Sequence, residues 1–158
     1  MELEQQIALL VKNAPADGVT PKVMEVAISP ILKAFAIQLK HLEYYVLKTI
    51  DGGWVLTTLS NRAQQSLEKN VIYAFPTLKD AASFQGTGDP QVIASPVPVT
   101  HILFQMFALE KVDSTVFVET PSNLSTGTEV RRLDLQKLIQ VQLKAFRVKP
   151  DNLPPDIA

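Results

Sequence analysis

Cysteine is absent from the 158-residue chain, and its absence excludes several kinds of chemistry. A protein without cysteine forms no disulfide, uses no thiolate nucleophile, and holds no iron–sulfur cluster or cysteine zinc site. This composition fits a reducing compartment, so we expect a cytoplasmic protein.

The chain also has no large excess of positive or negative charge. Lys and Arg number 15 and Asp and Glu 16, which gives a formal net charge of −1 at pH 7. Proteins that bind nucleic acid or acidic membranes usually carry a basic excess, because phosphate groups attract cations. The most apolar segment, residues 23–39, contains Glu25 and Lys33, whereas a membrane span needs about 20 apolar residues. We therefore expect neither a nucleic-acid partner nor a membrane partner.

The common signatures of enzymes and metal sites are also missing. The sequence contains no G-x-S-x-G motif of a serine hydrolase. His41 and His101 are its two histidines, and neither is followed by a histidine or a carboxylate three or four residues later. Zinc-binding helices use such spacing. We therefore expect no catalytic residue, no metal and no cofactor.

The composition that remains is that of an ordinary globular protein. Apolar residues make up 46% and charged residues 20%, and the length suits one domain with a core. Apolar residues at helical spacing predict N-terminal helices over residues 2–13, 20–28 and 30–40. We expect a single domain over residues 1–146 and a flexible, proline-rich tail over residues 147–158.

A hairpin is predicted after these helices. Two β-rich runs, residues 43–50 and 54–60, flank the turn Asp51-Gly52-Gly53. Glycine permits the positive φ angles of a tight turn, so this pattern predicts a β-hairpin. Apolar side chains occur on both faces of the first run, which indicates that the hairpin is covered on two sides or lies at an interface.

Three aromatic residues of this hairpin, Tyr44, Tyr45 and Trp54, are our candidates for a protein-interaction surface. An exposed aromatic cluster is typical of interfaces. The alternative is that the three rings pack in the core against the helices of residues 21–40, because large aromatic side chains are mostly buried.

The second half of the chain predicts strands that alternate with helices. The expected elements are a polar loop or single turn (62–69), a strand (71–75), a helix (78–84), a short edge strand (91–95), a helix (99–110), a strand (115–119), a polar loop (121–128), a brief pairing segment (129–132) and a last helix (134–146). A long connection with a helix allows the strands at 70–75 and 115–119 to run parallel. The fold class is therefore α+β, with N-terminal helices, a hairpin meander, and a mixed sheet flanked by helices.

Residues 70–140 contain a recognisable order of motifs. These are the strand VIYAF, the short helix DAASF, the segment SPVPVTHILFQMF, the strand VDSTVFVE and the segment VRRLDLQKLI. In this order they resemble the N-terminal domain of the enhanced serine sensitivity protein B (SseB-like) family. The resemblance implies a fold rather than an activity. The whole chain is also similar to small bacterial proteins of unknown function.

Thr77, Arg131 and Arg132 are candidates for binding an anion or another small ligand. The turn at Thr77 has no glycine to let the backbone approach a phosphate, so capping of the next helix is its alternative role. The alternative for the two arginines is a solvated surface. A pocket for such a ligand is expected near the 76–78 turn and the 120–132 loop.

These observations favour a non-catalytic intracellular protein-interaction or regulatory module. Its partner is expected to be another protein or a second copy of itself in a homodimer. The alternative is a small-molecule-binding protein, or an enzyme of unrecognised type, that uses the pocket near residues 76–78 and 120–132.

Overall fold

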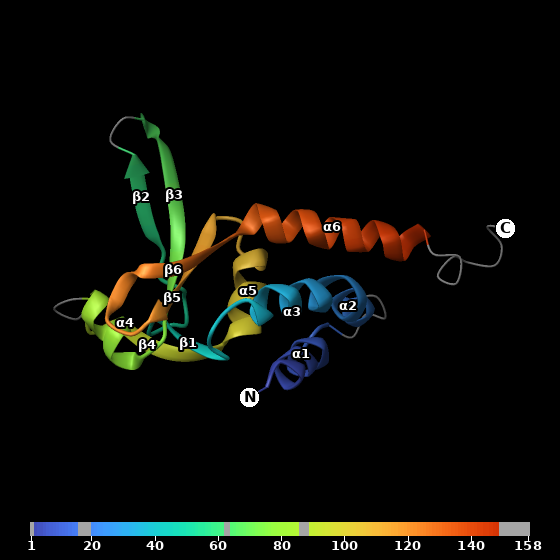
Figure 1. Cartoon of the computed structure of the whole chain (residues 1–158), viewed down its shortest axis with the longest axis horizontal. Coiled ribbons are helices and arrows are strands. Elements are labelled where there is room, and N and C mark those ends of the chain that lie inside the picture. Colours follow the sequence, from blue (N-terminus) through green and yellow to red (C-terminus); the bar gives the residue numbers. More distant parts are fainter. Residues whose placement is uncertain (1, 16–19, 62–63, 86–88, 149–158) are drawn as a thin grey trace.

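Six strands form one mixed sheet in the residues that this computed structural model describes, which are 2–15, 20–61, 64–85 and 89–148 (Figure 1). The strands are β1 (Glu43–Thr49), β2 (Thr57–Asn61), β3 (Gln64–Phe75), β4 (Val92–Pro98), β5 (Ser114–Thr120) and β6 (Asn123–Arg131). They lie in the order β4-β1-β3-β5-β6, and β2 pairs with β3. The helices are α1 (Leu3–Lys12), α2 (Thr20–Val23), the π-helical segment η1 (Met24–Ile28), α3 (Ser29–Ile37), α4 (Leu78–Gln85), α5 (Val99–Ala108) and α6 (Arg132–Val148). The predicted α+β class is confirmed.

The parallel pair at the centre of the sheet is β3 and β5, an arrangement that the long connection between them allows. Their register runs from Val71 opposite Ser114 to Ala74 opposite Phe117. The chain between them forms α4, β4 and α5, which gives it the length that a parallel crossover requires. The other strand pairs are antiparallel.

The prediction that residues 43–50 and 54–60 pair as a β-hairpin is confirmed at the turn and is wrong beyond it. The turn itself forms, with Gly52 at a φ of 94° and its N–H bonded to the carbonyl of Thr49 at 2.9 Å. A single bridge, Lys48 to Trp54, then joins the two runs. The chain diverges there because the end of β3 takes the position beside β1, and β4 pairs along the other side of β1.

Two segments predicted as polar loops are strands instead. The first part of β3 covers residues 64–69 and pairs with β2, and the two form a ribbon that projects from the sheet (Figure 1). Strand β6 includes residues 123–128 of the predicted loop, which leaves Pro121 and Ser122 as the turn after β5, and it continues through Arg131, so the pairing predicted at 129–132 is confirmed for its first three residues. In both cases pairing with a neighbouring strand overrides a composition rich in polar and turn-forming residues.

Several predicted boundaries also move. The edge strand expected at 91–95 extends to Pro98, and the helix expected to end at residue 110 ends at Ala108. The last helix begins at Arg132 and continues to Val148, so the first two residues of the predicted tail are helical. The rest of that tail, residues 149–158, lies outside the described residues.

Two clusters of buried side chains lie on the two faces of the sheet. The larger one contains Leu32, Tyr44 and Phe117, and it lies between the sheet and the helices that include α3 and α5. The smaller one contains Phe75 and Ala81 and lies beneath α4. Successive residues of a strand point to opposite faces, so β1 and β5 contribute to both clusters. The sheet is therefore the middle layer of the fold.

Candidate functional site

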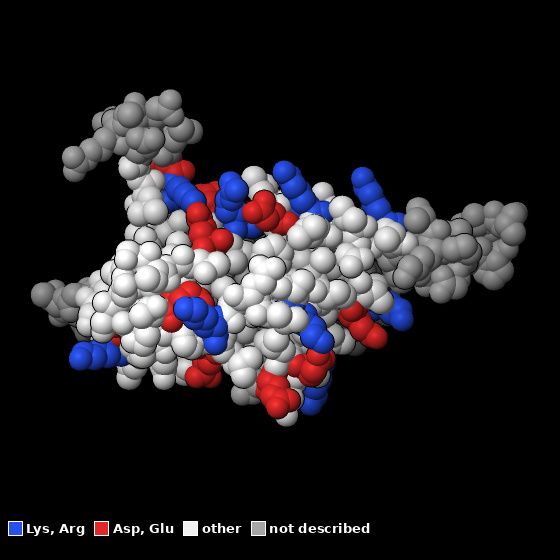
Figure 2. All heavy atoms as spheres, in the orientation of Figure 1, with Lys and Arg blue, Asp and Glu red and all other residues white. Residues whose placement is uncertain are grey.

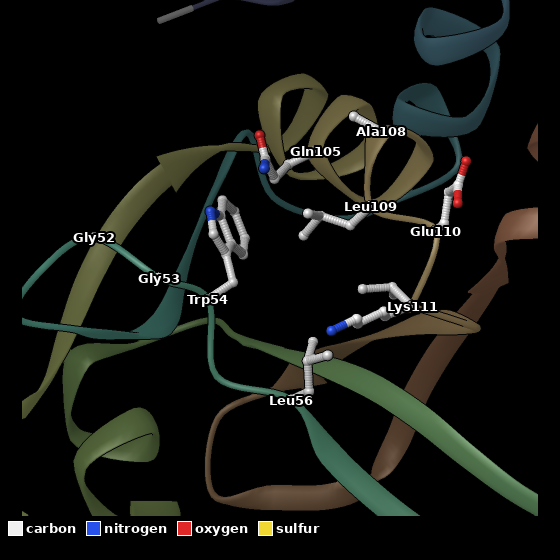
Figure 3. Close-up of a pocket in the computed structure, with 10 residues that line it drawn as sticks. Gly52, Gly53, Trp54, Leu56, Gln105, Ala108, Leu109, Glu110 and Lys111 are labelled. Carbon is white, nitrogen blue, oxygen red and sulfur yellow. The ribbon is translucent and has the colours of Figure 1, made fainter.

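A cleft with a volume of about 780 Å³ lies between the turn that follows β1 and the C-terminal end of α5 (Figure 3). One wall consists of residues 52–54 and 56, and the other of residues 105 and 108–112. These segments are far apart in the sequence, and the pairing of β1 with β3 and β4 brings them together.

The turn before Trp54 is held by its own side chains. The Thr49 hydroxyl donates a hydrogen bond to the Asp51 carboxylate, and the N–H of Gly53 donates to the Thr49 hydroxyl at 3.0 Å. The bond from Thr49, followed by the backbone bond from Gly53, holds the pKa of the Asp51 carboxyl below its usual range. The Lys48 ammonium lies 4.8 Å from the centre of the indole ring of Trp54. A cation and the face of an aromatic ring attract each other. Lys48 therefore helps to hold the orientation of the Trp54 ring.

The opposite wall is held by backbone hydrogen bonds after α5. Leu109 donates to the carbonyl of Gln105 at 3.0 Å, and Val112 donates to the carbonyl of Leu109 at 3.1 Å. Asp113 then joins β3, because its N–H and its carboxylate each bond to the backbone of Asn70 at 2.8 Å. The wall is therefore fixed to both α5 and the sheet.

The cleft combines an apolar surface with a few polar groups. The apolar side chains of the cleft are half-buried and also pack against the larger of the two buried clusters; they are Trp54, Leu56 and Leu109. In Figure 3 the ammonium group of Lys111 points toward the space beside Trp54, whereas Glu110 points away from it. The arrangement suits an apolar group lying against the indole ring. It does not place two titratable side chains together for acid–base chemistry.

Tyr44 and Tyr45 do not share a surface with Trp54. The Tyr44 side chain is fully buried, and its hydroxyl donates to the Glu119 carboxylate at 2.7 Å. Burial, followed by the bond to Glu119, raises the pKa of Tyr44 well above its usual value. Tyr45 is half-buried against the smaller cluster on the other face. The structure therefore places Tyr44 in the core, which was the alternative for these residues, and leaves Trp54 at the edge of the cleft.

Thr77, Arg131 and Arg132 are not brought together. Thr77 follows the C-terminal end of β3, whereas Arg131 pairs with Ser114 at the start of the parallel strand β5. These positions are at opposite ends of the sheet, because β3 and β5 run in the same direction. The predicted pocket between the 76–78 turn and the 120–132 segment therefore does not include the two arginines.

Each of these three residues has a local partner. The Thr77 hydroxyl accepts the N–H of Asp80 at 3.1 Å, which makes it the N-cap of α4. Arg131 faces Asp134 at 3.6 Å, and the Nε of Arg132 donates to the carbonyl of Phe107 at 3.1 Å. The capping role of Thr77 is confirmed. Arg132 provides a hydrogen-bond donor to a carbonyl near the end of α5, where backbone carbonyls lack partners within the helix.

A smaller hollow of about 280 Å³ does lie beside the 76–78 turn. It is bordered by Lys79, Asp80 and Phe84 of α4 and by Ser122 and Leu124 beyond β5. The Asp80 carboxylate accepts the N–H of Ser122 at 3.0 Å, so this side chain ties the turn after β5 to α4.

Gln105, Leu109 and Lys111 were not predicted as site residues. Gln105 and Leu109 belong to a strongly apolar segment that predicts a helix, and Lys111 lies in its connection to β5. Sequence signals for helix and core do not distinguish residues that line a cleft from those that pack the interior.

The charged side chains on one face of the molecule form no patch of a single sign. Lys and Arg side chains are interspersed with Asp and Glu on the face shown in Figure 2. Within the described residues, no group of three or more His, Asp or Glu side chains is arranged to hold a metal ion. In the same part of the chain, no helix has both the length and the apolar character that crossing a membrane requires.

Comparisons with protein-family models, with curated proteins and with solved structures found no match to this chain. The resemblance of residues 70–140 to the SseB-like family therefore stays a prediction.

Proposed function

We propose that this protein is a non-catalytic protein-interaction module, acting in the cytoplasm, whose cleft at Trp54 receives an apolar side chain of a partner protein. The observation that carries the proposal is the half-buried indole ring at the border of a cleft of about 780 Å³. Tryptophan is enriched among the residues that dominate binding energy at protein interfaces.

The surroundings of Trp54 support this function. Leu56 and Leu109 supply further apolar area around the space that the ring borders, and Gln105 and Lys111 supply polar groups around it. Protein interfaces commonly have this organisation, with an apolar centre and a polar rim. Lys48 and the hydrogen-bonded turn before Trp54 hold the ring in place. The side chain therefore loses less conformational freedom when a partner binds.

The experiment is affinity capture from the native lysate with a variant that fills the cleft. Ala108 lines the cleft and is exposed, so Ala108→Phe adds a ring there without removing a core group. Leu78→Ala, on the exposed surface of α4, is the matched control. We expect a stoichiometric partner with the wild type and with Leu78→Ala, and its loss with Ala108→Phe. Equal capture by all three proteins would contradict the role of the cleft.

A second candidate function, small-molecule binding, is supported by the volume of the same cleft. Ligand sites commonly enclose about 300–1,000 Å³, and this cleft lies within that range. A metabolite present at about 100 times its dissociation constant would add roughly 2.7 kcal/mol to the free energy of unfolding. A thermal-shift screen in which a compound stabilises the wild type but not Ala108→Phe would favour this function over a protein partner.

A further inference from the structure

The two outermost strands in the order β4-β1-β3-β5-β6 are protected differently. Strand β4 forms one edge. The N–H of Val99, the residue after β4, bonds to the carbonyl of Leu42, so it points to the side on which β1 lies. Residues of a strand alternate in direction, so Pro96 and Pro98 occupy positions whose N–H would point outward, away from β1. Proline has no N–H to offer there, and it is a common means of blocking edge pairing.

Strand β6 forms the opposite edge and has no such protection. The N–H of Arg132 bonds to the carbonyl of Asp113 on the β5 side at 2.9 Å. By the same alternation, the N–H and C=O groups of Gly127, Glu129 and Arg131 point away from β5. β6 is nine residues long, and its side chains from Asn123 to Glu129 are exposed on both faces. A long, open edge of this kind is a template for another strand.

We propose that β6 pairs antiparallel with β6 of a second copy of this chain, which joins the two sheets across a twofold axis near Thr128. A twofold interface must be complementary to itself. Residues 121–128 carry no charge, so an axis at Thr128 places Glu129 opposite Gly127 of the second copy and Arg131 opposite Ser125. Like charges do not face each other, and a threonine pair, which is favourable in antiparallel sheets, lies on the axis.

The local structure limits where the pairing begins. The Ser125 N–H already bonds to the Asn123 side chain at 3.1 Å, and the ladder between β5 and β6 shifts its register between Val118 and Thr120. The regular and open part of β6 is therefore residues 127–131. With an axis at Thr128, Gly127, Thr128 and Glu129 pair within this part, and Arg131 lies opposite Ser125 at the margin of the interface. β3 and β5 separate this edge from β1, so the interface does not depend on the Trp54 cleft.

The chain has no cysteine, so one introduced cysteine gives a clean test. The N–H and C=O groups of Thr128 point toward β5. In the proposed dimer, Thr128 and its counterpart in the second copy therefore form a non-hydrogen-bonded pair, with Cα atoms about 4.5 Å apart. That separation allows a disulfide. Thr128→Cys is expected to form a covalent dimer on mild oxidation, whereas Ile93→Cys, at a position that is also exposed but lies on the proline-protected edge, stays monomeric.

Light scattering on the wild type at about 100 μM is the accompanying measurement. We expect a mass of twice 17.4 kDa, and we expect Thr128→Lys, which places two cations at the axis, to return the mass to that of one chain with unchanged circular dichroism. A monomeric wild type would overturn the proposal. A dimer that persists in Thr128→Lys, or equal cross-linking by Thr128→Cys and Ile93→Cys, would also overturn it, because the dimer would then use another surface.

Discussion

The hydroxyl group of Tyr44 donates a hydrogen bond to the carboxylate of Glu119 over 2.7 Å inside the core. The same carboxylate accepts the N–H of Lys40 at 2.9 Å, and the backbone carbonyl of Glu119 bonds to the His41 ring at 3.0 Å. Glu119 is 6% exposed. This one residue at the end of β5 therefore holds the segment that connects α3 to β1.

Tyr44→Phe is expected to lower the free energy of unfolding by about 1–3 kcal/mol, because it leaves a buried carboxylate oxygen without its donor. Urea denaturation measures the loss. Tyr45→Phe, on the other face of β1, is the control and should change stability by less than about 0.5 kcal/mol. Equal effects of the two substitutions would contradict the importance of the Tyr44–Glu119 bond.

Thr77→Ala removes the oxygen that accepts the Asp80 N–H at the start of α4. The expected loss of stability is about 1 kcal/mol, as for other N-cap substitutions. Thr77→Ser keeps the hydroxyl and should retain most of the stability in a thermal denaturation experiment. If serine were as damaging as alanine, the hydroxyl would not be the group that matters.

Ser122→Gly is expected to stabilise the protein. Ser122 has a φ of 63° in the turn between β5 and β6, and a left-handed conformation costs a residue with a side chain about 1–2 kcal/mol. Glycine adopts this conformation freely but loses more backbone entropy on folding, so we expect a net gain of about 0.5–1 kcal/mol in urea denaturation. The bond to Asp80 uses the backbone N–H and is kept. A loss of stability would contradict this account of the turn.

The Glu129 carboxylate gives stability that depends on pH. The bond from the Lys69 ammonium, followed by that from the Ser114 hydroxyl, holds the pKa of Glu129 below its usual value near 4.5. A lowered pKa in the folded state contributes stability at pH values above the unfolded pKa, and this stability is lost as the pH falls through the folded pKa.

Glu129→Gln is therefore expected to be less stable than the wild type at pH 7, with a difference that shrinks below about pH 4. Both side chains of the Lys69–Glu129 pair are more than a third exposed, so solvent screening limits the difference to about 0.2–1 kcal/mol. Urea denaturation at a series of pH values measures it. A difference that stays constant across the series would mean that the charge of Glu129 is not its source.

The segment around residues 70–84 could be predicted because its signals are local. Pro76 lacks an N–H and ends the strand, and Thr77 supplies the cap of α4. The turn at Gly52 was predictable for the same reason, since glycine tolerates its φ of 94°. In each case the deciding groups lie within a few residues of one another.

The strands that were missed depend on distant partners. Residues 123–128 are rich in serine, threonine and glycine, which are typical of turns, yet they pair with β5. Gly127 allows close approach there, because a Cβ atom at this position would lie 2.8 Å from a methyl carbon of Val116, and one of the two would have to shift. The Trp54 cleft was missed for a related reason: it depends on the pairing of β1 with β3 and β4, which local patterns do not specify.

The central claim is that a partner occupies the cleft beside Trp54, and this residue is the single tryptophan of the chain. Incorporation of 5-fluorotryptophan therefore gives one ¹⁹F resonance located at the cleft. The measurement is the ¹⁹F NMR spectrum before and after addition of the partner captured from the native lysate. The account predicts that this resonance shifts or broadens in the wild type and stays unchanged in Ala108→Phe. A captured partner that leaves the wild-type resonance unchanged would contradict it, because binding would then occur away from Trp54.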